Sequence, residues 1–295
     1  MKLPLFSIAK SARCTCLPKY NINPYLGRCA HRCIYCYAAK FPSFTGPTTP
    51  RSSLIKDIAN MVGNTEKKLP VMLSDATDPY QPMETRHEIT RRCLEVLAEN
   101  GFPLLIVTKS DLVTRDIDIF RRTPTVVSIT ITTARKNIAG LIEPYAPPPG
   151  MRFSALKRVT EENIPTAVRI DPIIPTLNSD RQDLEKIVFK AAESGVKQVT
   201  ASTLKPIRGF FQSLRKAHPP LFETLKRVYA DGEWISGYKY LGREKRLGIL
   251  EEVRSIALSY GLEFATCREG FPELSTTICD GTAYCRGLLI NNYLG

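Results

Sequence analysis

The chain of 295 residues carries a formal net charge of +12, and 43% of its residues are hydrophobic. This fraction supplies enough apolar side chains for a large core and excludes a globally disordered chain. No apolar run reaches the ~18 residues of a membrane span, and the opening stretch MKLPLFSIAKSAR is too short and too interrupted by lysine and proline for a signal peptide. We therefore expect a soluble, cytoplasmic protein with no membrane partner.

The predicted elements alternate between short strands and amphipathic helices after residue 70. Strands are predicted at 71–75, 103–109, 125–133, 164–173 and 197–202. Helices are predicted at 84–100, 111–122, 150–163 and 180–195, with a further helical stretch that ends near residue 229. This alternation is typical of βα units around a parallel sheet.

We predict an α/β fold, a partial (βα)6 TIM-type barrel with an N-terminal cysteine segment and a small C-terminal extension. The predicted division is an N-terminal segment over residues 1–22, the barrel over 23–232 and the extension over 233–295. A full eight-fold barrel would need more βα units than the sequence supplies.

Polar residues follow the predicted strands at their C-terminal ends, where barrel-type folds carry their chemistry. The successive strands contribute Ser74, Asp75, Thr77 and Asp78; Thr108 and Lys109; Thr132 and Thr133; Arg169 and Asp171; and Ser202, Thr203 and Lys205. Solvation of the strand ends would also explain polar residues there, but the recurrence on five strands favours a functional site.

Three cysteines lie within eight residues in the stretch GRCAHRCIYCYA, as Cys29, Cys33 and Cys36. A structural zinc site would need four ligands, commonly as two separated pairs, and three unrelated thiols are improbable in so short a stretch. A [4Fe–4S] cluster held by three thiolates keeps one iron open for a substrate or cofactor. The spacing therefore favours such a cluster.

This spacing, with an aromatic residue before the last cysteine, resembles the motif of the radical S-adenosylmethionine (SAM) superfamily. The resemblance implies that SAM binds the open iron and that its reductive cleavage yields a 5′-deoxyadenosyl radical. It also implies an electron donor such as ferredoxin or flavodoxin. Within the superfamily, the chain resembles spore photoproduct lyase and proteins similar to it through the stretches NPYLGRCAHRCIYCYA, SDATDPYQPME, IVTKS, SITITT, EPYAPPPGMRFSALK and IDPIIP.

The resemblance also implies roles for single residues. Thr77 would contact SAM, Lys109 would reach the SAM carboxylate, and the tyrosines Tyr35 and Tyr37 would lie beside the cluster, either to relay a radical or to pack against it. The predicted cofactor-binding residues are Ser74, Asp75, Thr77, Asp78, Lys109 and Thr132. Ala76 stands about where the lyase has its hydrogen-donating cysteine, so repair of thymine dimers does not follow from the resemblance.

Five further cysteines lie near the two ends of the chain: Cys14, Cys16, Cys267, Cys279 and Cys285. The ends of compact domains often lie close together, so these thiols could hold an auxiliary Fe–S cluster or a zinc ion. Alternatively, Cys267 or Cys279 supplies the missing hydrogen atom, or the five cysteines are unrelated. Cys93 lies on the apolar face of a predicted helix and is expected in the core.

The segment 205–246 contains ten Lys and Arg residues and four acids, a net charge of +6. Aromatic residues are interleaved with these cations, a composition typical of a nucleic-acid groove, although a solvated helix face with core aromatics has the same composition. The predicted substrate-binding residues are Arg243, Lys245, Arg246, Tyr238 and Tyr240, and Trp234 could also stack on exposed bases.

The sequence thus predicts a radical SAM enzyme that acts on a nucleic acid, by repairing a DNA lesion or modifying a nucleotide. One alternative is a radical SAM enzyme that modifies a peptide or protein. Another is a non-enzymatic nucleic-acid-binding protein that carries zinc or a cluster.

Overall fold

The computed structural model describes residues 2–6 and 13–285. Seven strands form one sheet in the order β1-β4-β5-β6-β7-β8-β11, and every neighbouring pair is parallel. The strands are β1 (Tyr20–Ile22), β4 (Val71–Leu73), β5 (Leu104–Thr108), β6 (Thr125–Thr130), β7 (Thr166–Ile173), β8 (Gln198–Thr203) and β11 (Glu263–Thr266). Because neighbours in the sheet follow one another along the chain, the sheet winds in one direction, as a barrel does.

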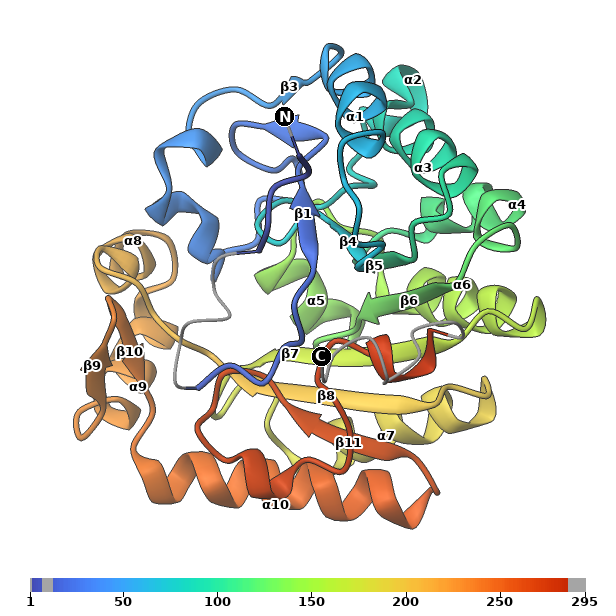
Figure 1. Ribbon diagram of the computed structural model, residues 1–295. Coiled ribbons are helices and arrows are strands. Elements are labelled where there is room, and N and C mark those ends of the chain that lie inside the picture. The colour runs from blue at the N-terminus through green and yellow to red at the C-terminus, as the bar shows by residue number, and fades with distance from the viewer. Residues whose placement is uncertain (1, 7–12, 286–295) are drawn as a thin grey trace.

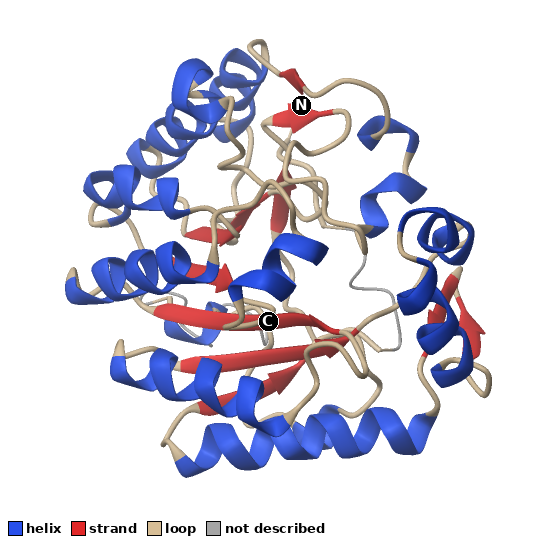
Figure 2. Ribbon diagram, turned by 180° about the vertical axis from the view of Figure 1, so that it is seen from behind, coloured by secondary structure: helices blue, strands red, loops and turns tan. Residues whose placement is uncertain are grey.

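Helices lie in the connections between these strands, and most of them cover the outer face of the curved sheet, whereas α8 (Phe210–Ala217) and α9 (Pro219–Val228) lie beyond its C-terminal end (Figures 1 and 2). The helices are α1 (Leu54–Val62), α2 (Glu84–His87), α3 (Ile89–Glu99), α4 (Ile117–Phe120), α5 (Lys136–Ile142), α6 (Pro149–Glu161), α7 (Arg181–Glu193), α8 (Phe210–Ala217), α9 (Pro219–Val228) and α10 (Arg243–Ser259). Two small antiparallel pairs complete the described strands: β2 (Tyr25–Leu26) with β3 (Thr49–Pro50), and β9 (Glu233–Ile235) with β10 (Tyr238–Tyr240).

This architecture confirms the predicted α/β partial barrel. The seven strands are joined by six connections, each of which contains at least one helix. The predicted domain division stays a prediction, but two strands come from outside its barrel range: β1 lies within residues 1–22 and β11 within 233–295. They form the two edges of the sheet and are not paired with each other in the described parts of the chain, so the barrel is open between them.

The core lies between the sheet and its outer helices. Leu94 and Leu97 of α3, Val127 and Ile129 of β6 and Leu156 of α6 are fully buried in one cluster. Each such side chain contributes about 1.5–3 kcal/mol through burial. The helices predicted to end at residues 100 and 195 end at Glu99 and Glu193. Gly101 and Gly195 follow these two helices with positive φ (+70° and +76°), a conformation that glycine adopts without a Cβ clash.

The inner face of the sheet is partly polar. Residues 198–203 of β8 are all buried, but they alternate between Val199 and Ala201, which pack on the helices, and Gln198 and Thr200, which hydrogen-bond to the segment after β11. That segment therefore fills the barrel interior.

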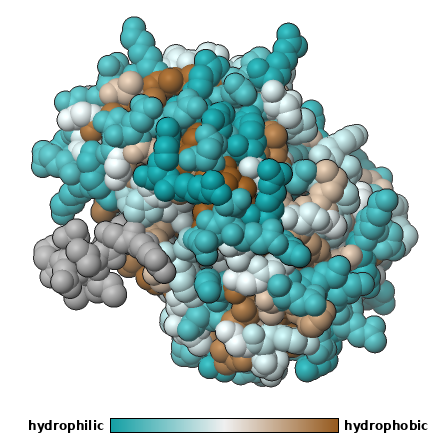
Figure 3. Space-filling view, turned by 90° about the vertical axis from the view of Figure 1, so that its right-hand side faces the viewer, coloured by the Kyte–Doolittle hydropathy of each residue, from teal (hydrophilic) through white to brown (hydrophobic). Residues whose placement is uncertain are grey.

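The outer surface in Figure 3 is mostly hydrophilic, with hydrophobic residues in scattered patches. Among the helices of the described residues, none combines the length and the hydropathy needed to cross a membrane. The cytoplasmic location stays a prediction.

Candidate active site

The cysteine loop follows β1 at the C-terminal end of the sheet, the end to which the arrowheads of β8 and β11 point in Figure 1. Gly27 begins the loop with a φ of +73°, and a Cβ there would lie 1.8 Å from the carbonyl oxygen of Pro47. Backbone hydrogen bonds from Gly27 to Ser43 and from Ile34 to Ile142 hold the loop against η3 (Pro42–Phe44) and α5. The loop is thus fixed at both ends.

Cys29, Cys33 and Cys36 lie close enough for each thiolate to affect the others. Burial, followed by the nearby Asp78 carboxylate, raises the pKa of Cys29 to about 11. Burial also raises the pKa of Cys33, although Lys109 opposes this effect. A metal that binds here must therefore displace thiol protons, as metal binding by cysteine generally does.

Asp78 ties the loop after β4 to the end of β5. Its carboxylate accepts hydrogen bonds from the Thr108 hydroxyl (2.6 Å) and the Lys109 backbone N–H (2.7 Å), and His31 Nδ1 lies 3.4 Å away. Burial alone would raise the pKa of Asp78, but His31 and these hydrogen bonds lower it to about 2. Since its oxygens are engaged by the protein, Asp78 positions the loop.

The other predicted residues of this loop line the same region. Ser74 has a φ of +60°, and Thr77 donates hydrogen bonds to the Ser74 hydroxyl (3.4 Å) and the Tyr25 carbonyl (3.5 Å). Asp75 accepts from Asn21 through its side chain and from the Tyr37 hydroxyl through its backbone. The structure therefore brings the loop at residues 74–78 beside the cysteine loop.

Lys109 lies over the ring of Tyr35, with Nζ 5.6 Å from the ring centre. The Tyr35 hydroxyl donates to Glu143, and Glu143 pairs with Arg152 at 2.6 Å. The side chains of Glu143 and Arg152 are 0% and 1% exposed, so this ion pair is enclosed by protein. Burial would lower the pKa of Lys109, but Cys33 and Glu143 raise it, so the lysine stays charged beside the cysteine loop.

Glu143 and Arg152 were not predicted as site residues, although both lie in the stretch EPYAPPPGMRFSALK. Arg152 also donates to the carbonyl oxygens of Pro147 (2.7 Å) and Thr130 (3.1 Å). The sequence signal that could have found them is an acid and a base on either side of a proline-rich turn that leads into a helix.

Thr132 lies on the same rim, after β6. Its hydroxyl is buried and has no hydrogen-bond partner among the described protein atoms. A buried hydroxyl without a hydrogen-bond partner costs about 1–3 kcal/mol. A ligand that supplied this partner would gain about the same amount of binding free energy. Thr132 thus suits the predicted cofactor-binding role.

The predicted substrate residues divide into buried and exposed members. Tyr238, Tyr240 and Arg246 are 6%, 2% and 5% exposed; Arg246 pairs with Glu269 (3.2 Å) and lies over the Tyr240 ring. Their burial gives these three a structural role, and a direct contact with substrate stays a prediction. Arg243 and Lys245 are exposed, and Lys245 pairs with Asp231 at 3.0 Å.

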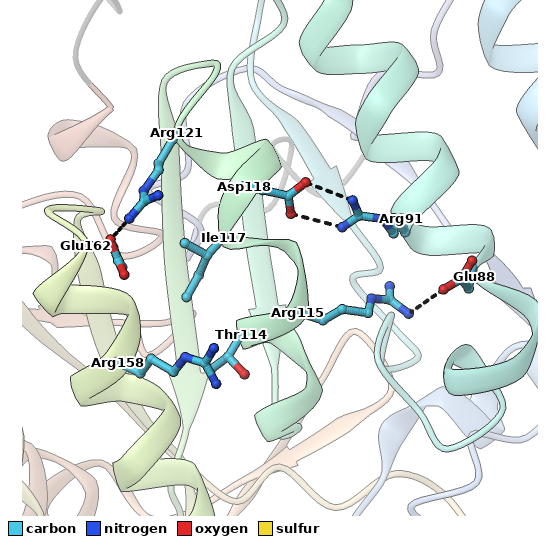
Figure 4. Close-up of a pocket in the computed structure, with 9 residues that line it drawn as sticks. All are labelled: Glu88, Arg91, Thr114, Arg115, Ile117, Asp118, Arg121, Arg158 and Glu162. Carbon is cyan, nitrogen blue, oxygen red and sulfur yellow. Dashed lines mark hydrogen bonds and ion pairs between the residues drawn. The ribbon is translucent and has the colours of Figure 1, made fainter.

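A surface cavity of about 540 Å³ lies on the outer side of the barrel, between α3, α4 and α6 (Figure 4). Six of its seven charged residues pair across it, as Arg91 with Asp118, Arg115 with Glu88 and Arg121 with Glu162, and Arg158 is the seventh. Since the paired charges compensate each other and none of the predicted site residues lines it, the cavity carries no functional assignment.

A family model described as the radical SAM superfamily matches residues 23–191. The chain belongs to the radical SAM superfamily. It is 30% identical to the uncharacterized protein MJ0683 of Methanocaldococcus jannaschii, over 74% of this chain and 83% of that protein. It is 21% identical to a radical SAM Nalpha-GlyT isomerase of Pseudomonas phage M6, over 84% of this chain and 53% of the isomerase.

The fold of this radical SAM protein is similar to that of spore photoproduct lyase, as predicted. The solved complex of that lyase with dinucleoside spore photoproduct superposes with a TM-score of 0.67 at 14% identity, over 84% of this chain and 75% of the lyase. At this identity the likeness shows the fold, and the reaction of the lyase is not transferred by it.

Superfamily membership implies a [4Fe–4S] cluster and SAM, and the residues on the rim fit both. Three half-buried thiols lie together, and a cluster held by them would keep one iron open. The Lys109 cation and the unpartnered Thr132 hydroxyl supply charge and hydrogen bonding for a zwitterionic cofactor. The predicted electron donor stays a prediction.

We predict that replacing Lys109 with methionine raises the dissociation constant of SAM by about 10–150-fold, because a charge-assisted hydrogen bond contributes about 1.5–3 kcal/mol. Anaerobic equilibrium dialysis with labelled SAM measures the change. Lys109→Arg keeps the charge and serves as the matched variant, with an intermediate affinity expected. Equal SAM affinity in the methionine variant and the wild type would show that Lys109 does not bind the carboxylate of SAM.

Proposed function

We propose that this radical SAM enzyme acts on a nucleic acid, to repair a lesion or modify a nucleotide. When bound, the cluster and SAM supply a 5′-deoxyadenosyl radical. A surface of the chain must then bind a nucleotide at the rim of the barrel.

The observation that carries the proposal is the contact between the β9–β10 hairpin and the cysteine loop. Tyr238 of β10 packs on Tyr37, next to Cys36, with ring centres 6.4 Å apart. The backbone N–H of Lys239 donates to the Pro206 carbonyl (2.7 Å), which ties the hairpin to the chain after β8. The hairpin therefore borders the site where a substrate would react.

The two faces of the hairpin differ. Lys239 is paired with Trp234 across the two strands, so these side chains share one face, opposite to that of Tyr238 and Tyr240. Trp234 is 50% exposed and Lys239 is partly exposed. An exposed tryptophan beside a lysine can stack on a base while the cation contacts a phosphate.

Further cations border the same region. Arg28 directly precedes Cys29, Arg32 directly precedes Cys33, and both are exposed. Arg208 is exposed between β8 and the hairpin. Arg28 and Arg32 add to the net charge of +6 of segment 205–246, in which Arg208 is already counted, and these charges would raise the local concentration of a polyanion. A protein of similar fold supports this substrate class, because the solved complex of spore photoproduct lyase contains dinucleoside spore photoproduct.

The test is a salt titration of nucleic-acid binding. We expect Trp234→Ala to weaken binding of single-stranded DNA or tRNA by about 5–150-fold, as the loss of one stacked base. Lys239→Ala should lower the slope of log K against log salt by about 0.7–0.9. Filter binding at several salt concentrations measures both quantities.

The matched control is Lys157→Ala, which removes an exposed cation from the outer helix α6 and should change neither quantity. Unchanged affinity and slope in both hairpin variants would refute the proposed surface. In that case, peptides that increase the release of 5′-deoxyadenosine more than nucleic acid does would favour the peptide-modifying alternative.

A further inference from the structure

Four of the five cysteines near the chain ends meet at the open edge of the barrel, which we call the seam. Cys14 and Cys16 precede β1, Cys267 directly follows β11, and Cys279 lies on the segment that fills the barrel. The Sγ atoms of Cys16 and Cys279 are 3.6 Å apart. Cys14 contacts Cys16, and Cys267 contacts Cys279, so the four thiols form a continuous group.

The protein backbone holds Cys279 in this group. Its carbonyl oxygen accepts hydrogen bonds from the Thr200 hydroxyl (2.8 Å) and from Arg169 (3.4 Å), on two neighbouring strands. The next residue, Asp280, pairs with Lys19 at 2.7 Å, and both side chains are almost fully buried (5% and 2% exposed). The segment is therefore fixed to the sheet from both edges of the seam.

Two cations lie beside three of the four thiols. Lys19 lies close to Cys16 and Cys279, and Arg169 hydrogen-bonds to Cys267. Thiolates are the form that binds metals, and neighbouring cations stabilise thiolates. A cysteine that merely fills the core has apolar neighbours instead, as Cys93 does among the core residues around α3 and Cys285 does among Met72, Leu105 and Val126.

The geometry points to a mononuclear metal site. Zinc binds four thiolates in a tetrahedron at about 2.3 Å, which places the sulfurs ~3.8 Å apart. The Cys16–Cys279 separation is close to this value, and it is far above the ~2.0 Å of a disulfide. In a [4Fe–4S] cluster each iron takes one thiolate, so two sulfurs in contact are unsuited to it.

We propose that Cys14, Cys16, Cys267 and Cys279 bind one tetrahedral zinc ion that closes the seam of the barrel. Among the described residues, no three such side chains already stand in ligand geometry around one metal position, and this applies to the three cysteines of the active-site loop as well. Binding draws the four sulfurs inward and displaces their protons. Cys285 takes no part.

The site has a structural purpose that its position explains. Zinc with four protein ligands has no open position for a substrate, so such a site stabilises a fold. Here it joins the chain before the first strand of the sheet to the chain after the last one. A metal-bound thiolate has no hydrogen atom to give, so the site also excludes Cys267 and Cys279 as hydrogen-atom donors.

The test uses the full chain with Cys29, Cys33 and Cys36 replaced by alanine, so that the active-site cluster is absent. We expect about one zinc per chain by elemental analysis and, after exchange, one equivalent of Co²⁺ with the visible absorption of a tetrahedral tetrathiolate site. Adding Cys16→Ser and Cys279→Ser should remove both signals, whereas Cys285→Ser should leave them unchanged.

A folded triple variant that binds neither zinc nor cobalt would overturn the proposal, and so would iron and sulfide in place of zinc. Since substitutions can impair folding, a second measurement uses the wild-type chain before any iron is added: one zinc per chain should be released by a mercurial that blocks thiols. The absence of such zinc also overturns the proposal. None of these readouts depends on nucleic-acid binding, so the two proposals fail separately.

Discussion

Replacing Cys33 with alanine is expected to abolish reductive SAM cleavage. Each of the three thiolates would hold one iron of the cluster, so a chain that lacks one of them would hold the cluster by two ligands only. Cys33 is partly exposed and lies next to the Lys109 cation. The measurement is 5′-deoxyadenosine formed per chain after anaerobic reconstitution and addition of dithionite and SAM, and we expect only background formation.

The matched control is Cys93→Ala, which removes a buried thiol from α3, away from the loop. It should keep both the iron content and the cleavage. Cleavage at the wild-type rate by a homogeneous Cys33→Ala chain would show that the C-x3-C-x2-C loop does not hold the reactive cluster.

Replacing Arg152 with methionine is expected to destabilise the protein by about 3–5 kcal/mol, because it leaves the Glu143 carboxylate buried without its cation. For a chain of this size, the melting temperature should fall by about 6–20 °C. Calorimetry or circular dichroism measures this change. We also expect the iron content after reconstitution to fall, because Glu143 holds the hydroxyl of Tyr35 beside the cysteine loop.

The double variant Arg152→Met with Glu143→Gln removes both charges and should recover most of the loss, since the cost arises from the unpaired charge. Lys157→Met breaks an exposed pair with Glu161 on the same helix and should change the stability by no more than about 1 kcal/mol. If the Arg152→Met variant is as stable as the double variant, an unpaired Glu143 carboxylate does not lower the free energy of unfolding, and the explanation is wrong.

The inner strands could be predicted because each is a buried run of β-branched and aliphatic residues followed by an amphipathic helix. The edge strands could not. Both β1 (YNI) and β11 (EFAT) mix polar with apolar residues, unlike the equally short but wholly apolar β4 (VML). Only their pairing with β4 and β8 makes them strands.

The cysteine loop could be predicted because its ligands are close in sequence, so their spacing alone describes the chemistry. The Tyr35–Glu143 hydrogen bond joins residues 108 positions apart, and no local pattern connects them. The convergence of the terminal cysteines was a hypothesis from chain-end proximity, and the structure brings four together but packs Cys285 among apolar side chains.

The composition of the β9–β10 hairpin does not tell which of its residues lie on the same face. Tyr238 and Tyr240 alternate with Lys239, so the aromatic residues and the cation point to opposite faces. The sequence signal for the two faces is the dipeptide Ser236-Gly237. It forms a two-residue turn with positive φ at both residues (52° and 81°), and such a turn fixes the register of the strands and therefore the face of each side chain.

The buried pair of Lys19 and Asp280 has a consequence for how the protein is made. Its two residues are 261 positions apart, and at about 5–20 residues per second a ribosome needs roughly 13–50 s to pass from one to the other. During that time Asp280 has not been synthesised, so Lys19 cannot be buried as an ion pair. The segment that fills the inside of the barrel is also missing. The inner face of the sheet therefore stays uncovered in the nascent chain until the last segment is synthesised, and chaperones can bind to it during this time.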